Sequence, residues 1–213
     1  MFERAAFTLI LVAMFAVLPA VAQKVNARPT PTPSIVLEPF DRADVKTMAS
    51  KCVTLDTESG MIDIELFPES APESVRNFLN LAAIGAFDTT LFSRVVPGFV
   101  VQGGNVWTRA GGVMPELGKR AIRTIPDEPN KILHERGIVS MARPDEPNMA
   151  TSHFFILVSE ASYLDGKFAA FGRVTRGMEI VDAINRAPVT DEKPNKPVRV
   201  KRASVLNCTT LER

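Results

Sequence analysis

One stretch of the sequence combines residue types that could do chemistry. Residues 92–104 read Phe-Ser-Arg-Val-Val-Pro-Gly-Phe-Val-Val-Gln-Gly-Gly. They place one cation, Arg94, between apolar residues, and an amide, Gln102, before two glycines. These residue types are compatible with a functional site. The pattern alone favours a simpler interpretation, two buried strands from which Arg94 points into solvent.

Other catalytic and ligand-binding motifs are absent or incomplete. Gly118-Lys119 resembles the end of a phosphate-binding loop, but the preceding glycine is one residue too far away and no Ser or Thr follows. No serine stands in a G-x-S-x-G setting. His134 is predicted to lie on a surface loop and His153 to begin a strand. Neither forms a ligand pattern with the distant cysteines, so we expect no metal site.

Charge argues against a nucleic-acid-binding chain. The 213 residues carry 25 basic and 24 acidic side chains, and both signs are intermixed. A phosphate-backbone binder needs a clustered basic face. The densest basic stretch, residues 198–202, alternates apolar and charged residues, as the solvent face of a strand does.

The elements that must position Arg94 and Gln102 are mostly short strands. Helices are predicted over about residues 177–184 and from the N-cap Ser70, with Glu73 reaching back, to a stop at Gly85. Eight strands and two helices indicate a mainly β fold, an eight-stranded antiparallel closed β-barrel capped by two α-helices. The predicted strands are residues 52–56, 61–67, 90–96, 99–102, 137–142, 153–158, 169–174 and 198–206.

Two long irregular segments, residues 103–131 and 143–151, lie between these strands. Long loops in a compact domain are typical of functional regions. Both contain the sequence Pro-Asp-Glu-Pro-Asn, starting at Pro126 and at Pro144. The match is too short to indicate a structural repeat, and we interpret it as a coincidence of loop composition.

The N-terminus predicts export. Arg4 precedes an apolar stretch, residues 5–18, which is followed by Pro19 and the small-residue pattern Ala-Val-Ala. This pattern predicts a Sec-type secretory signal peptide over residues 1–22. Residues 23–48, with prolines at every second position from Pro29 to Pro33, are assigned to an extended linker, and residues 49–213 to the folded domain. An uncleaved signal anchoring the chain in the inner membrane is the alternative to a periplasmic or otherwise exported protein.

Two cysteines, Cys52 and Cys208, lie near the two ends of the predicted domain. In an oxidising compartment such a pair invites a disulfide. The alternative is two small buried side chains that never meet, and the sequence by itself does not decide between them.

Residues 92–104 resemble the cyclophilin signature F-H-R-[IV]-[IV]-P-G-F-x-x-Q-G-G-D. The resemblance continues in order through residues 137–142, 151–156, 163–167 and 171–174. It identifies the chain as a member of the cyclophilin-type peptidyl-prolyl cis–trans isomerases. What it implies is a barrel with an active-site groove on its outside, no cofactor, and first and last strands side by side. That adjacency favours the Cys52–Cys208 disulfide.

The resemblance also implies residue roles. Arg94 matches the catalytic arginine of the family, and Gln102 matches the glutamine that orients it. The backbone of Arg143 matches the position that pairs with an extended substrate. The remaining positions matched to substrate binding are Phe99, Val100, Ala142, His153, Phe155, Tyr163, Leu164 and Phe168.

Several of these positions depart from the family pattern. His153 replaces the usual glutamine, Val100 stands where methionine is common, and Phe168 takes a histidine position. Tyr163 stands where many eukaryotic members have tryptophan, which puts strong cyclosporin binding in doubt. Arg143 is expected to add charge at the groove rim. These changes leave the peptide preference open but retain the catalytic arginine.

The function expected from this resemblance is acceleration of X–Pro bond rotation in exported proteins, assisting their folding, by a monomer. Its partners would be proline-containing segments of folding proteins, with no nucleic acid and no membrane tether unless the signal is uncleaved. The alternative is a non-catalytic periplasmic chaperone or proline-peptide binding module that uses the same groove. A tethered structural component of the envelope is a third interpretation.

Overall fold

The computed structural model describes residues 37–210. The predicted signal peptide and the proline-rich part of the predicted linker lie outside these residues. The described part of that linker, residues 37–48, packs on the domain: Arg76 Nη1 donates to the carbonyl oxygens of Phe40 and Ala43 at 2.7 Å. Met48 is fully buried. Within residues 37–210 no helix combines the length and the apolar character needed to cross a bilayer.

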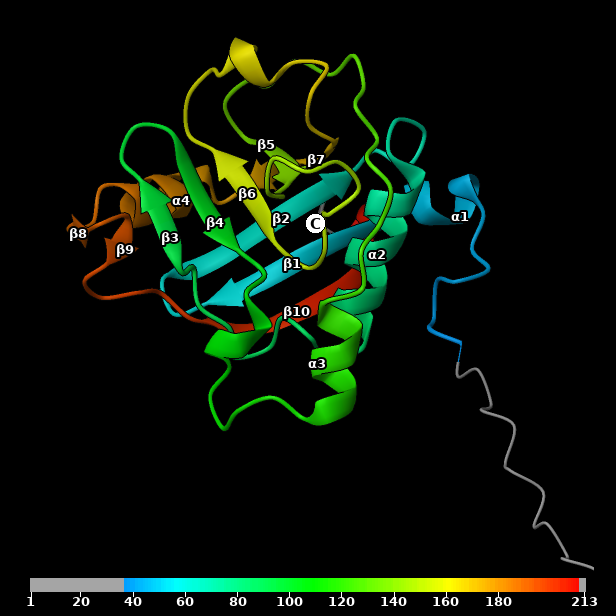
Figure 1. The fold of residues 1–213 in the computed structure, drawn as a ribbon, viewed down its shortest axis with the longest axis horizontal. Helices are drawn as coiled ribbons and strands as arrows, with labels where there is room; N and C mark the ends of the chain where they lie inside the picture. Colours follow the sequence, from blue (N-terminus) through cyan, green and yellow to red (C-terminus); the bar gives the residue numbers. More distant parts are fainter. Residues whose placement is uncertain (1–36, 211–213) are drawn as a thin grey trace, which may run out of the picture. The chain divides into compact units, whose positions relative to one another are not determined.

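The domain is built on one curled antiparallel sheet of eight strands (Figure 1). Its strand order is β10-β1-β2-β7-β5-β6-β4-β3. A separate two-stranded hairpin, β8 (Val189–Thr190) and β9 (Lys193–Pro194), follows the last α-helix. The main-sheet strands are β1 (Lys51–Thr57), β2 (Gly60–Leu66), β3 (Arg94–Val96), β4 (Val100–Gly103), β5 (Ile138–Met141), β6 (Phe154–Leu157), β7 (Ala170–Arg176) and β10 (Val200–Asn207).

The sheet is an open half-barrel, so the predicted closed barrel is wrong. The two outer strands, β10 and β3, do not pair with each other among the described residues. Across the opening, Leu91 and Arg199 form an isolated bridge. Phe92 N also donates to the Val198 carbonyl oxygen at 3.0 Å, and Val200 N donates to the Thr90 carbonyl oxygen at 2.8 Å. Residues 90–93, predicted as part of a strand over 90–96, make these contacts without forming a continuous ladder, and β3 begins only at Arg94.

Four α-helices accompany the sheet within residues 37–210, two more than the sequence predicts. The expected pair is α2 (Pro72–Ala83) and α4 (Met178–Asn185). The additional α1 (Val45–Ala49) and α3 (Pro115–Ala121) are too short to show an apolar period. The Asp44 carboxylate caps α1 by accepting from Thr47 N at 2.7 Å. Three 3-10 turns are η1 (Val106–Thr108), η2 (Ser162–Leu164) and η3 (Cys208–Thr210).

The start of α2 is capped from a distance. Ser70 is not the N-cap, as predicted, because the helix begins at Pro72. The Glu128 carboxylate instead accepts from Glu73 N at 2.9 Å and from Ser74 N at 2.8 Å. A carboxylate at this end complements the positive end of the helix dipole. It also ties the long loop that contains Glu128 to the core of the domain.

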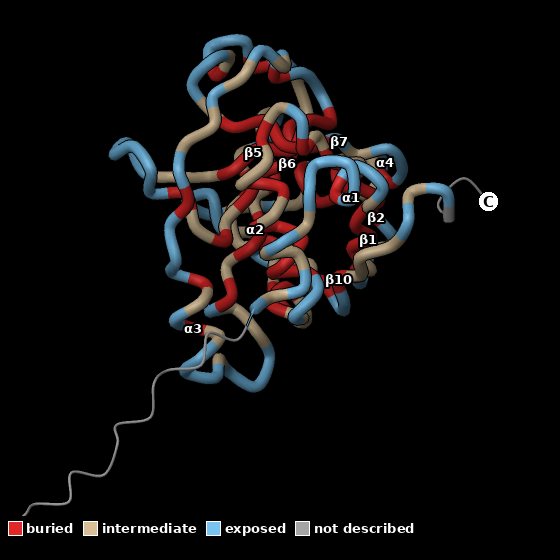
Figure 2. The backbone as a smooth tube through the Cα atoms, turned by 90° about the vertical axis from the view of Figure 1, so that its right-hand side faces the viewer, coloured by how far each residue is buried: buried red, intermediate tan, exposed pale blue. Residues whose placement is uncertain are grey.

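The main core lies between the inner face of the sheet and α2. Four phenylalanines meet there, with ring centroids 5.0 to 5.6 Å apart: Phe78, Phe87, Phe154 and Phe171. Figure 2 shows buried residues concentrated along α2 and the strands beside it. A second, smaller apolar cluster consists of Val100, Ile138, Phe155, Leu157, Ala161, Leu164 and Ala170.

The first and last strands are joined covalently. β1 and β10 pair along their lengths, from Lys51 opposite Asn207 to Thr57 opposite Val200. Cys52 and Cys208 form a disulfide with their Cα atoms 5.0 Å apart. The bond closes a loop of 156 residues, which restricts the unfolded chain strongly.

Candidate active site

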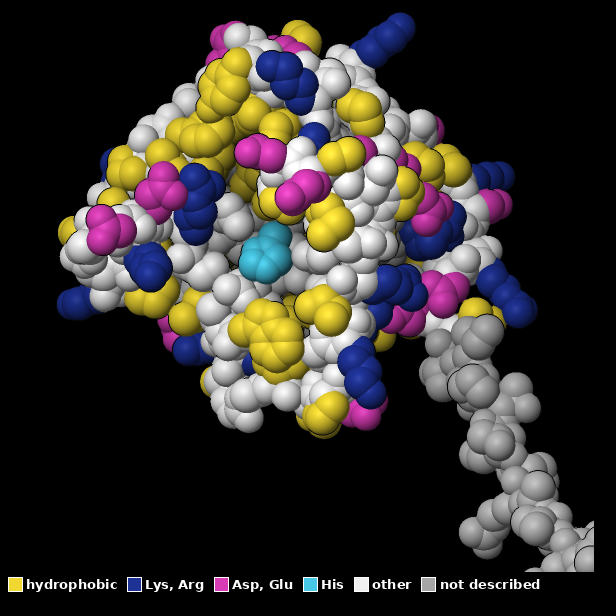
Figure 3. Space-filling model, in the orientation of Figure 1, with side chains coloured by type: hydrophobic (Ala, Val, Ile, Leu, Met, Phe, Trp, Pro, Cys, Tyr) yellow, Lys and Arg dark blue, Asp and Glu magenta, His cyan; other side chains and the backbone are white. Residues whose placement is uncertain are grey.

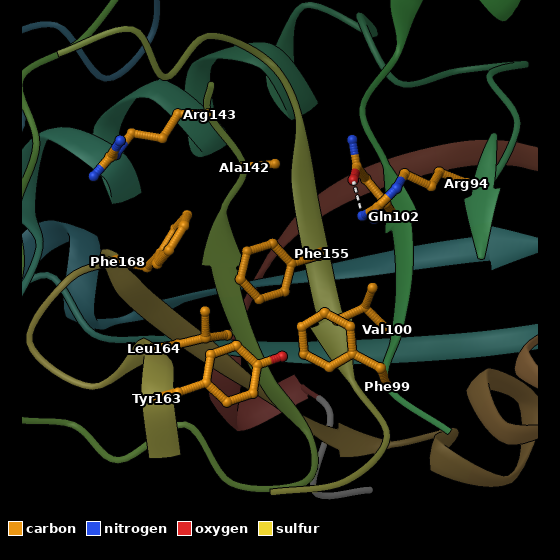
Figure 4. Close-up of a pocket in the computed structure, with 10 residues that line it drawn as sticks. All are labelled: Arg94, Phe99, Val100, Gln102, Ala142, Arg143, Phe155, Tyr163, Leu164 and Phe168. Atoms are coloured by element: carbon orange, nitrogen blue, oxygen red, sulfur yellow. Dashed lines mark hydrogen bonds between the residues drawn. The ribbon is translucent and has the colours of Figure 1, made fainter. Parts of the chain in front are cut away.

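The predicted site residues come together in a groove over the smaller apolar cluster (Figure 4). A cavity of about 210 Å³ is lined by Arg94, Phe99, Val100, Gln102, Ala142, Arg143, Phe155, Tyr163, Leu164 and Phe168. Every residue matched to catalysis or substrate binding lines this cavity except His153. Figure 3 shows hydrophobic side chains gathered on this face over β4 and β6.

Strand register brings the apolar wall together. In β4 and β6, alternate side chains point to opposite faces, so Val100 and Phe155 face the groove. Phe168 packs edge-on against Phe155 at 6.0 Å between ring centroids. On the other side Phe99 lies 5.8 Å from Tyr163. The result is a concave apolar surface that fits a small nonpolar ring.

Arg94 forms the polar wall opposite these rings. It stands across from Gln102 in the β3–β4 pair, and its Nη1 donates to Gln102 Oε1 at 3.2 Å. Its Nε donates to Glu192 Oε2 at 2.7 Å. Glu192 comes from the β8–β9 hairpin, 98 residues along the chain, and no local pattern in the sequence could have revealed it.

The turn that joins β3 to β4 is fixed by a buried amide. Asn185, at the end of α4, donates from Nδ2 to the carbonyl oxygens of Val96 at 2.9 Å and Val100 at 3.0 Å. Its Oδ1 accepts from Gly98 N at 2.8 Å. Gly98 has a φ of 73°, which favours glycine there. Asn185 therefore fixes the conformation of the turn, and with it the position of Arg94 relative to Phe99.

His153 lines a second cavity, of about 570 Å³, which adjoins the first and shares Arg94, Gln102, Ala142 and Arg143 with it. Burial lowers the pKa of the His153 imidazole. Its ring is therefore neutral at pH 7. The lining residues that the sequence analysis did not assign are Pro144, Met149 and Thr151. They belong to the long irregular segment 143–151. The length of this segment is the feature of the sequence that could have pointed to them.

Arg143, expected to add charge at the groove rim, lines both cavities, and its charge is paired with Asp127. Its side chain is 16% exposed, and its Nε lies 3.3 Å from Asp127 Oδ1. Its guanidinium also covers the Phe168 ring, at 5.1 Å from the centroid, and Nη1 donates to the Pro144 carbonyl oxygen at 2.8 Å. The charge is thus neutralised while the side chain holds the loop against the groove.

The two Pro-Asp-Glu-Pro-Asn segments lie side by side at this edge. Ile125 and Ala150, which flank them, form an isolated antiparallel bridge. Asp127 N donates to Asn148 Oδ1 at 2.9 Å. These contacts link the two long loops, the second of which contributes Pro144 and Met149 to the second cavity.

His134 is buried, so the prediction of a surface loop residue is wrong. Its Nδ1 lies 3.0 Å from Asp165 Oδ1, and its Nε2 lies 3.0 Å from Ser140 Oγ. Hydrogen bonding from the His134 backbone N–H lowers the pKa of the Asp165 carboxyl. Serine, histidine and aspartate in this order resemble a nucleophile relay, but Ser140 is fully buried. The network is therefore structural, and it anchors the end of η2, which carries Tyr163 and Leu164.

Comparisons with known proteins agree with this geometry. The family model described as "Cyclophilin type peptidyl-prolyl cis-trans isomerase/CLD" matches residues 52–205. Peptidyl-prolyl cis-trans isomerase A of Dickeya dadantii is 35% identical over 166 residues, covering 72% of this chain and 84% of the relative. A peptidyl-prolyl cis-trans isomerase of Acinetobacter baylyi is 33% identical over 176 residues, covering 78% and 90%.

Two further likenesses extend the comparison. The isomerase CYP57 of Arabidopsis thaliana is 39% identical over 148 residues, which cover 68% of this chain but only 28% of that protein's length. Among solved structures, a Cryptosporidium parvum cyclophilin-type isomerase crystallised in the presence of the dipeptide Ala-Pro superimposes with a TM-score of 0.64. It is 30% identical, and the match covers 73% of this chain and 98% of that one.

Proposed function

The chain belongs to the cyclophilin-type peptidyl-prolyl cis–trans isomerase family, and from that premise we propose that its groove holds the proline ring while Arg94 promotes rotation. Its function is peptidyl-prolyl cis–trans isomerisation. The observation that carries the assignment of Arg94 is its position, anchored on Gln102 and Glu192 beside an apolar cavity.

The reaction makes and breaks no covalent bond. Rotation about an X–Pro bond meets a barrier of about 18–20 kcal/mol because amide resonance must be disrupted. In the twisted state the prolyl nitrogen loses conjugation and gains a lone pair. A donor that hydrogen-bonds this lone pair stabilises the twisted amide more than either planar form, which is what lowers the barrier.

Arg94 can supply that donor. Its Nε and one Nη1 hydrogen are engaged by Glu192 and Gln102. Within the described part of the chain, its Nη2 donates to no other residue. An anchored guanidinium with donors left over suits a hydrogen bond that forms only in the transition state.

The remaining residues hold the peptide. Phe99, Phe155 and Leu164 offer an apolar wall to the proline ring. In the described residues the backbone N–H and C=O of Arg143 have no backbone partner, so an extended substrate strand can pair there. The proline is thereby fixed while the residue before it rotates.

The test compares the protein with an Arg94→Ala variant in cis–trans exchange of an Ala-Pro peptide measured by NMR. Removing a transition-state donor lowers the exchange rate by about 10²–10³. Peptide binding and the thermal midpoint stay near those of the unmodified protein. Equal rates in the two proteins would remove Arg94 from the mechanism. A folded, peptide-binding protein without exchange would favour the non-catalytic binding module instead.

We further propose that the substrates are exported proteins that fold in the periplasm. The signal pattern in residues 1–22 supports this, and so does the disulfide, which persists in oxidising compartments. Fractionation of bacterial cells expressing the full chain, with sequencing of the mature N-terminus, tests it. A soluble periplasmic product starting at Gln23 supports a cleaved signal, membrane retention with an intact N-terminus supports an anchor, and cytoplasmic recovery contradicts export.

A further inference from the structure

The β8–β9 hairpin brings a carboxylate to the catalytic arginine. Its two-residue turn consists of Asp191 and Glu192, with φ angles of 49° and 61°. A hairpin turn with both central residues at positive φ normally has Asn, Asp or Gly at the first position and Gly at the second, because most side chains disfavour this conformation. Figure 1 shows the hairpin beside the outer strand β3. Asp191 fits this pattern, but Glu192 stands where glycine is usual, and its unfavourable backbone conformation points to a constraint imposed by what the turn contacts.

The turn is fixed from both sides. Val95 N, in β3, donates to the Glu192 carbonyl oxygen at 2.8 Å. At the base of the hairpin, Asn195 N donates to the Pro188 carbonyl oxygen at 2.9 Å, and Thr190 Oγ1 bonds Asn195 Oδ1 at 2.9 Å. The backbone of Glu192 is therefore attached directly to the strand that carries Arg94. Its side chain reaches Arg94 Nε at 2.7 Å.

From this geometry we infer that Glu192 is a positioning residue, which orients the Arg94 guanidinium for the isomerisation. The inference rests on the proposed role of Arg94. Gln102 holds Nη1 from β4, while Glu192 holds Nε from the hairpin. Two acceptors on different elements fix the plane of the guanidinium, whereas one would leave it free to swing about a single hydrogen bond. The free Nη2 then keeps one direction relative to the cavity.

Orientation, rather than stability, is the effect expected from this ion pair. The Arg94 and Glu192 side chains are 41% and 51% exposed, and exposed pairs contribute little to folding. An unanchored arginine, in contrast, must be ordered each time the transition state forms. The benefit of Glu192 therefore appears in kcat and not in the thermal midpoint.

The experiment measures kcat and KM for Ala-Pro peptide exchange in Glu192→Ala, Glu192→Gln and Lys193→Ala. We expect Glu192→Ala to lower kcat about three- to tenfold, the penalty of ordering one long side chain, with KM unchanged. Glu192→Gln should restore most of the rate, because an amide oxygen also accepts from Nε. Lys193→Ala, in the same hairpin, is the matched control and should match the unmodified protein, and thermal midpoints verify that each variant is folded.

Measuring the effect of Glu192→Ala on kcat in an Arg94→Lys background separates the proposed role of Glu192 from the proposed role of Arg94. If the Glu192 carboxylate acts through the Arg94 guanidinium, removing the carboxylate changes kcat little once lysine has replaced the arginine. An equal loss of rate in both backgrounds, an unchanged kcat in Glu192→Ala, or an equal loss in Lys193→Ala would overturn the role of Glu192. If replacing Arg94 itself leaves the rate unchanged, the assignment of Arg94 fails first, and the role of Glu192 falls with it.

Discussion

Phe154 and Phe155 are consecutive residues of β6, but their side chains belong to opposite faces of the sheet. Phe154 lies in the main core, 5.2 Å from Phe78 and 5.6 Å from Phe87 between ring centroids. Phe155 lies in the groove, 6.0 Å from Phe168. Both are buried, so burial alone does not distinguish a core residue from a site residue. What distinguishes them is the strand geometry, in which successive side chains point to opposite faces of the sheet.

The two faces are also held together differently. The inner face is filled by apolar side chains packed between the sheet and α2. The groove face rests on a small apolar cluster and on directed polar contacts, such as those of Asn185, Arg143 and Glu192. Neighbouring residues of the same strands therefore serve either stability or catalysis, and substitutions should separate the two.

The largest expected effect comes from the disulfide, which joins strands away from the groove. Replacing both Cys52 and Cys208 by serine should lower the free energy of unfolding by about 5 kcal/mol, because the unfolded chain loses a long closed loop. The exchange rate should not change at temperatures where the variant is folded. Urea unfolding and peptide exchange measure the two quantities. A slower folded variant would mean that the groove depends on the β1–β10 end of the sheet.

The two phenylalanines provide the sharpest contrast. Phe154→Ala should lower the free energy of unfolding by about 4 kcal/mol, because it opens a cavity in the main core, with a small effect on exchange. Phe155→Ala should lower kcat/KM about 30-fold, because it removes an apolar wall contributing about 2 kcal/mol to proline binding. Its stability loss should be smaller, since its site already borders a cavity. If the two variants lost stability and kcat/KM to equal extents, or in the reverse order, the separation of stability and catalysis between the two faces of the sheet would be refuted.

The smallest effect is the pH response of the groove face. Burial lowers the pKa of folded His153 below its ordinary 6.5, so below that pH the unfolded chain binds more protons than the folded one. The free energy of unfolding therefore falls as the pH drops from 6.5 through the lower folded pKa, and above 6.5 His153 contributes no slope. Urea unfolding at pH 7 and pH 5 should show a smaller decline for His153→Gln. Identical declines would exclude His153 as the source.

Much of the groove could be predicted because it is encoded in contiguous motifs. Residues 92–104 carry Arg94 and Gln102 on paired strands, and their types at that spacing match one family. The eight main-sheet strands were predicted for the same reason, since each is a local pattern. The open sheet edge was not predicted, because whether β3 and β10 pair depends on contacts between segments that lie far apart in the sequence.

What the sequence could not provide were contacts between distant residues. Glu128 caps α2 from 54 residues away, which displaced the local candidate Ser70. His134 was predicted to lie on a surface loop because its sequence neighbours give no sign of a partner. In the fold, Asp165 and Ser140 contact its two ring nitrogens. Glu192 has no motif of its own, and only the folded hairpin shows what it reaches.

Trp107 and Tyr163 are the only tryptophan and the only tyrosine in the chain, and they stand in different places. Trp107, 60% exposed, lies against Gly118 of α3, where an added Cβ would come within 2.9 Å of the indole. Tyr163 lines the groove. Indole emission therefore reports on the α3 region, while a fluorotyrosine label gives one ¹⁹F resonance from the groove itself. The chain thus has a built-in spectroscopic reporter for peptide occupancy and a separate one for the region around α3.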